Sequence, residues 1–248
     1  MLKINYLYSL LWLMVVTSCT TKSDQTPVSA AGLLSGSIQL WDDKTSTLTD
    51  NSGVVITVDD LSNTSAQTDA MGKYSFSNLP YGLHDLTIAK AGYGSYRLFG
   101  VSHMTNTNGT TLPAVQLGKL ATTSVTSLTV SGTTYNGSPG VSVLYSVSPT
   151  PTAANRGYIR YFLSTDKGVS NTNYKYASSI LSVLNNNTTG GFTKDDLLTA
   201  GFTSGQTVYL RLYGESVQSN AYTDPNIGVM VFPNNNSTTV PAVSFVMP

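Results

Sequence analysis

From Gly36 onward, apolar residues alternate with polar ones along most of the chain, and clusters of Gly, Asn, Asp or Pro interrupt the alternation about every ten residues. Successive side chains of a β-strand point to opposite faces of its sheet, so an alternation with a period of two predicts strands that are buried on one face. The pattern predicts an all-β protein. In the amino-terminal half, the predicted strands lie around residues 38–40, 54–58, 74–76 and 83–88.

Residues 69–72, Asp-Ala-Met-Gly, precede one of these strands and predict a tight hairpin turn. Gly72 can adopt the positive φ that such a turn requires, because it has no Cβ. The side chain of Asp69 can cap the turn by accepting a hydrogen bond from the backbone. Further turns are predicted at residues 50–53 and 80–82.

The chain is long enough for two β-sandwich domains of roughly 100 residues each. A boundary is predicted near residues 118–123, where the last strand of the first module gives way to Thr- and Ser-rich sequence. Thr193 and Asp196 form a capping-box pattern, and Gly201 follows as a stop signal, so one helical turn is predicted there. Residues 176–184 fit either a strand or a short helix. The strands predicted in the second module cover residues 125–130, 141–147, 158–164, 208–213, 229–232 and 243–246.

The first module contains a spaced set of motifs: Thr-Asp-Ala-Met-Gly-Lys-Tyr at residues 68–74, Leu-Pro-Tyr-Gly at 79–82 and Gly-Tyr at 92–93. This set resembles the carboxypeptidase regulatory-like domain, a small transthyretin-like (prealbumin-like) β-sandwich, over residues 34–118. The resemblance implies a fold and not catalysis, because in that family the module accompanies zinc peptidases, transporters and adhesins without supplying their active residues. The connection at residues 41–52 is longer and more polar than is usual in the family.

The second module resembles an immunoglobulin-like fibronectin type III domain over residues 120–248. Residues 207–213 have the alternation and the early tyrosine of an F strand. Residues 158–164 then correspond to strand C, and residues 222–225, Tyr-Thr-Asp-Pro, to a turn before the final strands. The predicted fold is therefore all-β, with two tandem β-sandwich domains.

Cys19 is the only cysteine, and it directly follows Val-Thr-Ser and a short apolar run that begins after Lys3. A basic start, an apolar run and small residues at its end are the parts of a secretory signal peptide. The run has about 13 apolar residues, fewer than the roughly 20 that a membrane-spanning helix requires. The pattern resembles the lipobox of bacterial lipoprotein precursors. The resemblance implies a signal peptide over residues 1–18 and acylation of Cys19, with palmitate among the acyl chains. Residues 19–33 would then form a flexible tether.

The composition argues against several classes of function. Only 10% of the residues are charged, where about 25% is usual, and 13 basic residues are scattered among 13 acidic ones. Nucleic acid is therefore not an expected partner, because phosphate recognition uses clustered Lys and Arg. No cofactor is expected, since nothing in the sequence forms a cofactor-binding motif.

Few residues of the chain suit catalysis or metal binding. His84 and His103 lie in different segments without metal-ligand spacing, so both are predicted to be packed or on a sheet surface. Residues 164–167, Ser-Thr-Asp-Lys, match a serine-nucleophile pattern by chance, because they end a predicted strand instead of opening a helix. The protein is not predicted to be an enzyme. Paired aspartates at residues 42–43, 59–60 and 195–196 favour turn and helix roles, and leave calcium as an open alternative.

Aromatic residues are the remaining candidates for ligand contact. Trp41, Tyr81, Tyr93 and Tyr96 fall at or near predicted turns of the first module. At such positions a ring can stack on a sugar, anchor a partner protein or simply pack over the end of the sandwich.

The sequence thus predicts a non-catalytic, lipid-anchored cell-envelope protein whose β-sandwich modules bind a protein or glycan partner. Its predicted place is the outer membrane of a diderm bacterium, held by the lipid on Cys19, with the surface and periplasmic faces both open. A fimbrial or adhesin-type subunit is the alternative. Arginine-directed trimming of such a subunit requires an early arginine, whereas the first one here is Arg97.

Overall fold

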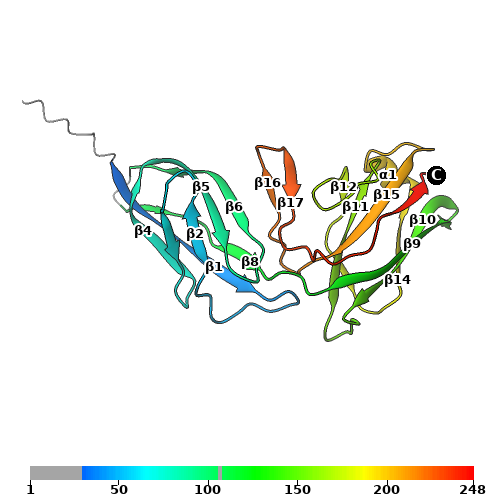
Figure 1. Cartoon of the computed structure of the whole chain (residues 1–248), viewed down its shortest axis with the longest axis horizontal. Coiled ribbons are helices and arrows are strands. Elements are labelled where there is room, and N and C mark those ends of the chain that lie inside the picture. Colours follow the sequence, from blue (N-terminus) through cyan, green and yellow to red (C-terminus); the bar gives the residue numbers. More distant parts are fainter. Residues whose placement is uncertain (1–29, 106–107) are drawn as a thin grey trace, which may run out of the picture.

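The computed structural model describes residues 30–105 and 108–248, so the predicted signal peptide and Cys19 lie outside the described residues. The described chain forms two β-sandwiches joined at residues 119–123, and the all-β prediction is confirmed (Figure 1). A β-hairpin within residues 222–231 stands between the two sandwiches.

The first sandwich consists of two four-stranded sheets. One sheet has β1 (Ala31–Trp41) at its centre, flanked by β4 (Lys73–Pro80) on one side and by β7 (Thr110–Thr111) and β8 (Val115–Gly118) on the other. The other sheet has the order β3 (Ser65–Gln67), β2 (Val55–Val58), β5 (Gly82–Ala89) and β6 (Tyr96–His103). Apolar side chains from both sheets meet in one core, which includes Leu34, Ile38, Ile56, Leu86 and Ile88.

Strand β1 shows how the alternation builds this core. Leu34, Ile38 and Leu40 are buried at alternate positions, as the period of two predicts. The strand begins at Ala31, so residues 31–33, predicted as the end of the tether, belong to the sheet. They are held there because Gly32 pairs with β4 and the ring of Tyr81 packs directly over Gly32.

The hairpin turn at residues 69–72 has the predicted chemistry. Gly72 has a φ of +77° and donates its backbone N–H to the carbonyl oxygen of Asp69 at 2.9 Å. The Asp69 carboxylate accepts a hydrogen bond from the N–H of Lys73 at 2.8 Å. A Cβ added at position 72 would lie 2.0 Å from the carbonyl oxygen of Ile38, so only glycine fits.

Strand β6 was not predicted from the sequence. It contains one of the aromatic candidates for ligand contact. Tyr96 opens this strand and does not lie in a turn. The alternation fails there because most of β6 is only half buried, and its pairing with β5 shifts register between His84 and Leu86.

The second sandwich also has two sheets. One has the order β14 (Thr188–Thr193), β10 (Ser138–Ser148) and β9 (Ser124–Tyr135). In the other, β12 (Tyr176–Ala177) and β13 (Leu181–Val183) both pair with β11 (Gly157–Ser164), which is followed by β15 (Thr207–Gly214) and β18 (Val243–Val246). Residues 176–184 therefore form two short strands and no helix.

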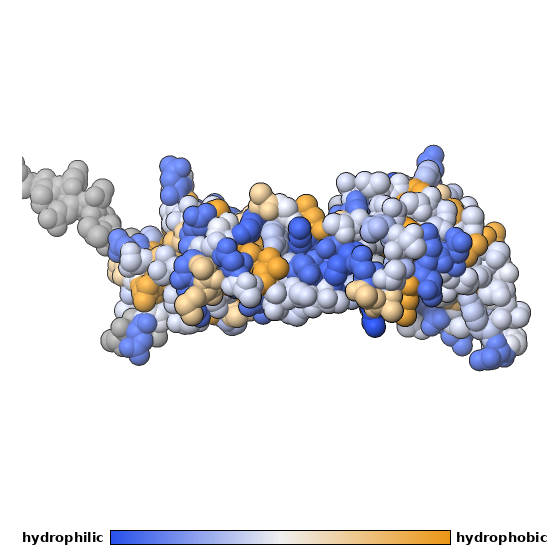
Figure 2. Space-filling view, turned by 90° about the horizontal axis from the view of Figure 1, so that it is seen from below, coloured by the Kyte–Doolittle hydropathy of each residue, from blue (hydrophilic) through white to orange (hydrophobic). Residues whose placement is uncertain are grey.

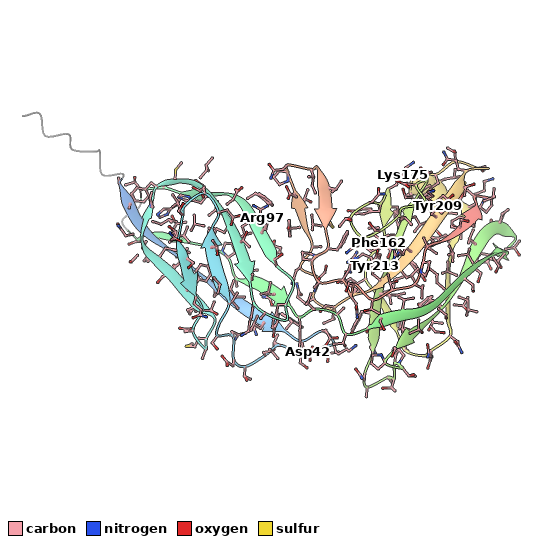
Figure 3. All side chains as sticks on the ribbon, viewed as in Figure 1. Asp42, Arg97, Phe162, Lys175, Tyr209 and Tyr213 are labelled. Atoms are coloured by element: carbon pink, nitrogen blue, oxygen red, sulfur yellow. The ribbon has the colours of Figure 1, made fainter. Side chains whose placement is uncertain are left out.

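Strand β11 is buried along its whole length, because both of its faces are covered. Its inward side chains, such as Ile159 and Tyr161, join the main core. On the outer face, Phe162 packs against Tyr213 of β15 and Phe232, with ring centroids 5.5 and 5.2 Å apart (Figure 3). The connection between β15 and β18 therefore forms a third layer over this sheet.

Helix α1 (Lys194–Thr199) has the predicted capping box. The Thr193 hydroxyl accepts a hydrogen bond from the N–H of Asp196 at 3.1 Å, and the Asp196 carboxylate accepts one from the N–H of Thr193 at 2.9 Å. Gly201 follows with a φ of +86°, which ends the helix as predicted.

The segment predicted as a turn at residues 222–225 is different in the structure. Residues Tyr222–Asp224 form strand β16, which pairs with β17 (Val229–Val231), and the turn lies at residues 225–228. The prediction was wrong because Asp-Pro suggested an immediate turn, whereas the hairpin turn begins only after Asp224.

Candidate binding groove between the sandwiches

A buried aspartate joins the two sandwiches. Asp43 lies just after β1, and its Oδ2 accepts hydrogen bonds from the N–H and the hydroxyl of Thr122, at 3.0 and 2.5 Å. The Asp43 carbonyl oxygen accepts a third bond from the N–H of Val217, at 3.2 Å. Lys44 lies 3.5 Å from the same carboxylate and donates to the hydroxyl of Thr123 at 3.0 Å. The polar loop after Trp41 is thus hydrogen-bonded to both the linker and the second sandwich.

The pKa of Asp43 reflects these contacts. Burial alone would raise the pKa of this carboxyl, but the hydrogen bonds from Thr122 and the nearby Lys44 ammonium hold its pKa below its ordinary value. The charged form is therefore the one that the junction stabilises.

Two fully buried asparagines form the second contact between the sandwiches. Asn220 accepts a hydrogen bond from the N–H of Gly118 at 2.6 Å and donates to the carbonyl oxygens of Gly94 and Gly118, at 2.9 and 3.0 Å. Asn234 accepts from the N–H of Asn220 at 3.1 Å and donates to the carbonyl oxygen of Gln218 at 2.8 Å. Every polar atom of the Asn220 side chain is used across the junction.

The β16–β17 hairpin makes the third contact, against β6. The ring of Tyr222 lies edge-on to Tyr96, with centroids 5.9 Å apart, and 6.0 Å from that of Phe99. Arg97 binds Asp59 at 2.8 Å and reaches Asp224 of the hairpin at 3.7 Å. Figure 3 shows Arg97 on the side of the first sandwich that faces the hairpin.

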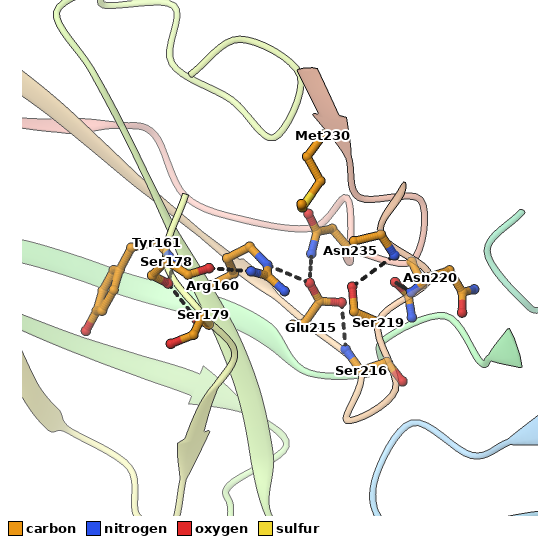
Figure 4. A network of polar contacts seen from close by, with 12 residues as sticks. Arg160, Tyr161, Ser178, Ser179, Glu215, Ser216, Ser219, Asn220, Met230 and Asn235 are labelled. Carbon is orange, nitrogen blue, oxygen red and sulfur yellow. Dashed lines mark hydrogen bonds and ion pairs between the residues drawn. The ribbon is translucent and has the colours of Figure 1, made fainter. Parts of the chain in front are cut away.

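A buried ion pair fixes the base of the hairpin. Arg160 of β11 donates to Glu215 at 2.9 Å and to the carbonyl oxygen of Ser178, while Asn235 donates to the same Glu215 oxygen at 2.9 Å (Figure 4). The Arg160 guanidinium also lies 4.4 Å from the centre of the Phe232 ring. Burial raises the pKa of Glu215, and the hydrogen bonds from Arg160 and its neighbours offset part of that rise.

Sequence reasoning missed this pair, although a signal was present. Glu215 is the only glutamate in the chain and directly follows a predicted strand. Charged residues are seldom fully buried unless they are paired, so a lone glutamate at that position and an arginine inside an apolar strand were a detectable pattern.

A groove with a volume of about 520 Å³ lies beside these contacts. One wall is strand β6, the opposite wall is the segment 112–116 that leads into β8, and residues 218–221 of the second sandwich close one side. The side chains that line it are mostly apolar, with glutamine and serine among them: Tyr96, Leu98, Val101, Ser102, Leu112, Val115, Gln116, Gln218, Ser219 and Ala221.

The groove lies between the unpaired edges of two sheets. Among the described strands, β6 pairs only with β5, and β8 pairs only with β1. Leu98, Val101, Leu112 and Val115 are only partly buried, yet they pack against the core of the first sandwich. The core is therefore open to solvent along the groove, beside edges that no other strand pairs, although Gly118 at the end of β8 is already bonded to Asn220.

The four aromatic candidates are not brought together. Tyr96 lines the groove, and Trp41 reaches it indirectly by donating its indole N–H to the side chain of Gln116. Tyr93 forms a bridge with Lys119 at the junction. Tyr81 lies at the other end of the first sandwich, where its ring centroid is 4.8 Å from that of His103.

Both histidines are packed inside the first sandwich. His84 is 4% exposed and contacts Asp60 and the carbonyl oxygen of Pro80, at 2.9 and 2.8 Å. His103 is fully buried and contacts Thr110 at 2.8 Å. Their burial matches the prediction of packed histidines.

The paired aspartates have structural contacts. Asp42 accepts three backbone N–H bonds from residues 44–46, and Asp59 binds Arg97. Asp195 and Asp196 lie in the first turn of α1. Within residues 30–105 and 108–248, no three His, Cys, Asp or Glu side chains are grouped so that they could hold a metal ion. Over the same residues, no helix has the length and apolar character needed to cross a membrane.

Comparisons with known proteins find matches among solved structures only. No family model matches the chain, and no curated protein matches it. A cohesin–X-dockerin complex from Acetivibrio cellulolyticus matches 36% of this chain and 59% of that chain, with 21% identity and a TM-score of 0.31.

Two further solved structures match most of this chain. A protein from Bacteroides uniformis, described as a candidate carbohydrate-binding protein, matches 88% of this chain and 99% of its own, with 12% identity and a TM-score of 0.30. The major pilin SpaD from Corynebacterium diphtheriae matches 87% of this chain and 67% of its own, with 14% identity and a TM-score of 0.27. At these scores, function has to be argued from the groove itself.

Proposed function

We propose that this protein is a non-catalytic, lipid-anchored protein of the outer membrane that binds an extended segment of a partner protein in the groove. The observation that carries the proposal is the open core between the unpaired edges of β6 and β8. The groove is the binding site, and the two sandwiches are the scaffold that holds it.

An added strand satisfies both features of the groove. Its backbone groups pair with a free sheet edge, which supplies affinity, and its alternate side chains enter the apolar space, which supplies specificity. Leu98 and Val101 on one wall and Leu112 on the other accept those side chains. Gln116 and Gln218 bind the polar parts of the segment at the groove's border.

The junction supports this role by keeping the walls in place. Residues 218–221 belong to the second sandwich, so the groove has its full shape only while Asp43 and Asn220 hold the sandwiches together. A preorganised groove loses less conformational entropy when a segment binds.

The lipid anchor comes from the lipobox at Cys19, and the fold is compatible with it. The described chain begins at the end of the first sandwich that is farther from the second one (Figure 1). Residues of the second sandwich, Gln218 and Ser219 among them, form part of the groove. Anchoring through Cys19 leaves the groove accessible to a partner. In the second sandwich, the order β9–β10–β14 facing β11–β15–β18 supports the fibronectin type III resemblance.

Binding without catalysis is supported by the polar groups of the described chain. Both histidines are buried and hydrogen-bonded, so neither is placed as a base beside a nucleophile. The Arg160–Glu215 pair is enclosed by its own partners. These groups stabilise the fold.

A glycan is the second candidate ligand, favoured by Trp41. Its side chain lies on the outer face of the β1 sheet and contacts Gln116, which lines the groove. Aromatic rings beside amide side chains suit sugar binding, because the ring covers the apolar face of the sugar and the amide bonds its hydroxyls.

Photo-crosslinking in living cells tests the proposal. A photoreactive phenylalanine analogue replaces Leu98, which lines the groove, in the full chain. The same analogue at Leu144, which is 47% exposed in the second sandwich, is the control. We expect a protein adduct from position 98 only, and a second copy of this chain as the adduct would favour the fimbrial alternative.

Equal labelling from the two positions would contradict the proposal. Glycan binding is tested separately on an array, with the Cys19→Ala chain and its Trp41→Ala derivative. If the array signal disappears with Trp41→Ala and no adduct forms at position 98, the results would favour glycan binding over binding of a protein segment.

A further inference from the structure

One end of the first sandwich has no formal charge. Four segments meet there, residues 30–35, 79–84, 102–105 and 108–111, and none contains Asp, Glu, Lys or Arg. Their two histidines are buried and hydrogen-bonded; of the acids next to these segments, Asp60 is paired with His84 and Asp85 accepts the N–H of Gly100. We call this surface the apolar end.

Large apolar side chains are exposed on the apolar end. Leu83 is 70% exposed, Met104 is 68% exposed and Leu33 is 42% exposed. A hollow of about 320 Å³ lies beside them, lined in part by Tyr81 and Leu83. In Figure 2, hydrophobic residues are visible at the left end of the molecule. A soluble surface seldom gathers exposed apolar side chains without charges between them unless it meets an apolar partner.

The chain enters the fold at this same end. The N–H of Tyr81 donates to the carbonyl oxygen of Ala30 at 3.0 Å, which places the first described residue beside the exposed side chains. Cys19 lies eleven residues before Ala30. A chain of that length spans at most about 40 Å, so a lipid on Cys19 keeps the apolar end close to the bilayer.

We propose that the apolar end docks on the membrane surface, with Leu83 and Met104 inserted at the boundary between headgroups and acyl chains. The inference rests on the lipid anchor of the proposed function, and it adds a second membrane contact made by the fold itself. The short tether raises the local concentration of bilayer around the apolar end, so a weak apolar contact is enough.

The lack of charge on the apolar end sets the lipid chemistry. No charged group has to lose water on insertion, and no basic group attracts anionic headgroups. Docking is therefore independent of the fraction of anionic lipid. It also fixes the orientation of the first sandwich relative to the membrane.

Spin labels on the acylated full chain test the docking. Because Cys19 is the only natural cysteine, acylation leaves a newly introduced cysteine as the single free thiol. The variants Leu83→Cys and Met104→Cys are labelled and reconstituted in vesicles of phosphatidylethanolamine, with and without phosphatidylglycerol. Val246→Cys is the matched control, since Val246 is 66% exposed on β18 of the second sandwich.

The readout is the ratio of label collisions with oxygen, which partitions into lipid, to collisions with a water-soluble nickel chelate. We expect this ratio to be several-fold higher at positions 83 and 104 than at position 246, and unchanged by phosphatidylglycerol. Equal ratios on acylated, vesicle-bound protein would overturn the docking alone. If intact mass shows that the mature protein carries no lipid on Cys19, and the protein does not bind vesicles, both the anchor and the docking are overturned.

Discussion

Replacing Asp43 with Asn probes the junction that shapes the groove. In the native protein, Oδ2 of Asp43 accepts two hydrogen bonds from Thr122 and lies 3.5 Å from the Lys44 ammonium. Asparagine keeps the size of the side chain but removes its charge. The substitution therefore weakens two charge-assisted hydrogen bonds and one ion pair at once, and leaves the packing unchanged.

The expected cost follows from the burial of the Asp43 side chain, which is 10% exposed. Hydrogen bonds to charged groups contribute about 1.5–3 kcal/mol, and little of that is screened at a buried site. A loss of this size lowers the melting temperature of a chain of this length by about 3–12 °C. The loss falls on the junction, so the two sandwiches should unfold less cooperatively.

Scanning calorimetry of the full chain measures this loss. The matched control is Asp50→Asn, since Asp50 lies in an exposed turn, away from the junction, where its carboxylate accepts the N–H of Ser52. We expect the control to change stability by less than about 0.5 kcal/mol. Equal effects of the two substitutions would refute the role given to Asp43.

The same comparison has a predicted pH dependence. The pKa of Asp43 is lowered in the folded state, so its contribution to stability is present above the ordinary aspartate value of 3.8 and is lost as the pH falls through the folded value. The native protein and Asp43→Asn should therefore converge in stability at acidic pH. A difference that stays constant with pH would show that the charge of Asp43 is not what stabilises the junction.

Three other substitutions have defined outcomes. Asn220→Ala leaves buried backbone groups at the junction without partners, so the free energy of unfolding in urea should fall by about 1–3 kcal/mol. An unchanged free energy would contradict the role of Asn220 in joining the sandwiches. Glu215→Gln leaves the Arg160 guanidinium buried without its counter-charge and should cost about 3–5 kcal/mol, more than the double replacement Arg160→Met with Glu215→Leu. Gly72→Ala should cost at least about 2 kcal/mol, because a Cβ there meets the Ile38 carbonyl oxygen, whereas Gly132→Ala, with open space around it, should be nearly neutral.

Local features of the fold were predictable from the sequence because their causes are local. The alternation in β1, the positive φ of Gly72 and the cap at Thr193 each depend on neighbours within a few residues. Strand β6 lacked this signal, since most of its residues face the hairpin and the groove instead of one uniform core.

The groove and the junction could not be read from the sequence, because they depend on contacts between distant segments. Asn220 binds Gly118 across 102 positions of the chain, and asparagine is too common here to mark one residue as buried. The open edge of β6 exists only because the sheet ends there, which the order of predicted strands does not reveal. Of the four aromatic candidates, only Tyr96 lines the groove.

Backbone amide exchange along the groove tests the central claim most directly. Peptides are selected from a random display library against the full chain, and hydrogen exchange of residues 98–103 and 114–117 is measured with and without a selected peptide. We expect selected peptides that alternate apolar and polar residues, slower exchange along β6 or β8, and loss of both effects in Val101→Lys, whose new charge occupies the apolar groove. Selected peptides that bind Val101→Lys equally well, or that leave the exchange of both edges unchanged, would contradict the claim that the groove accepts an added strand.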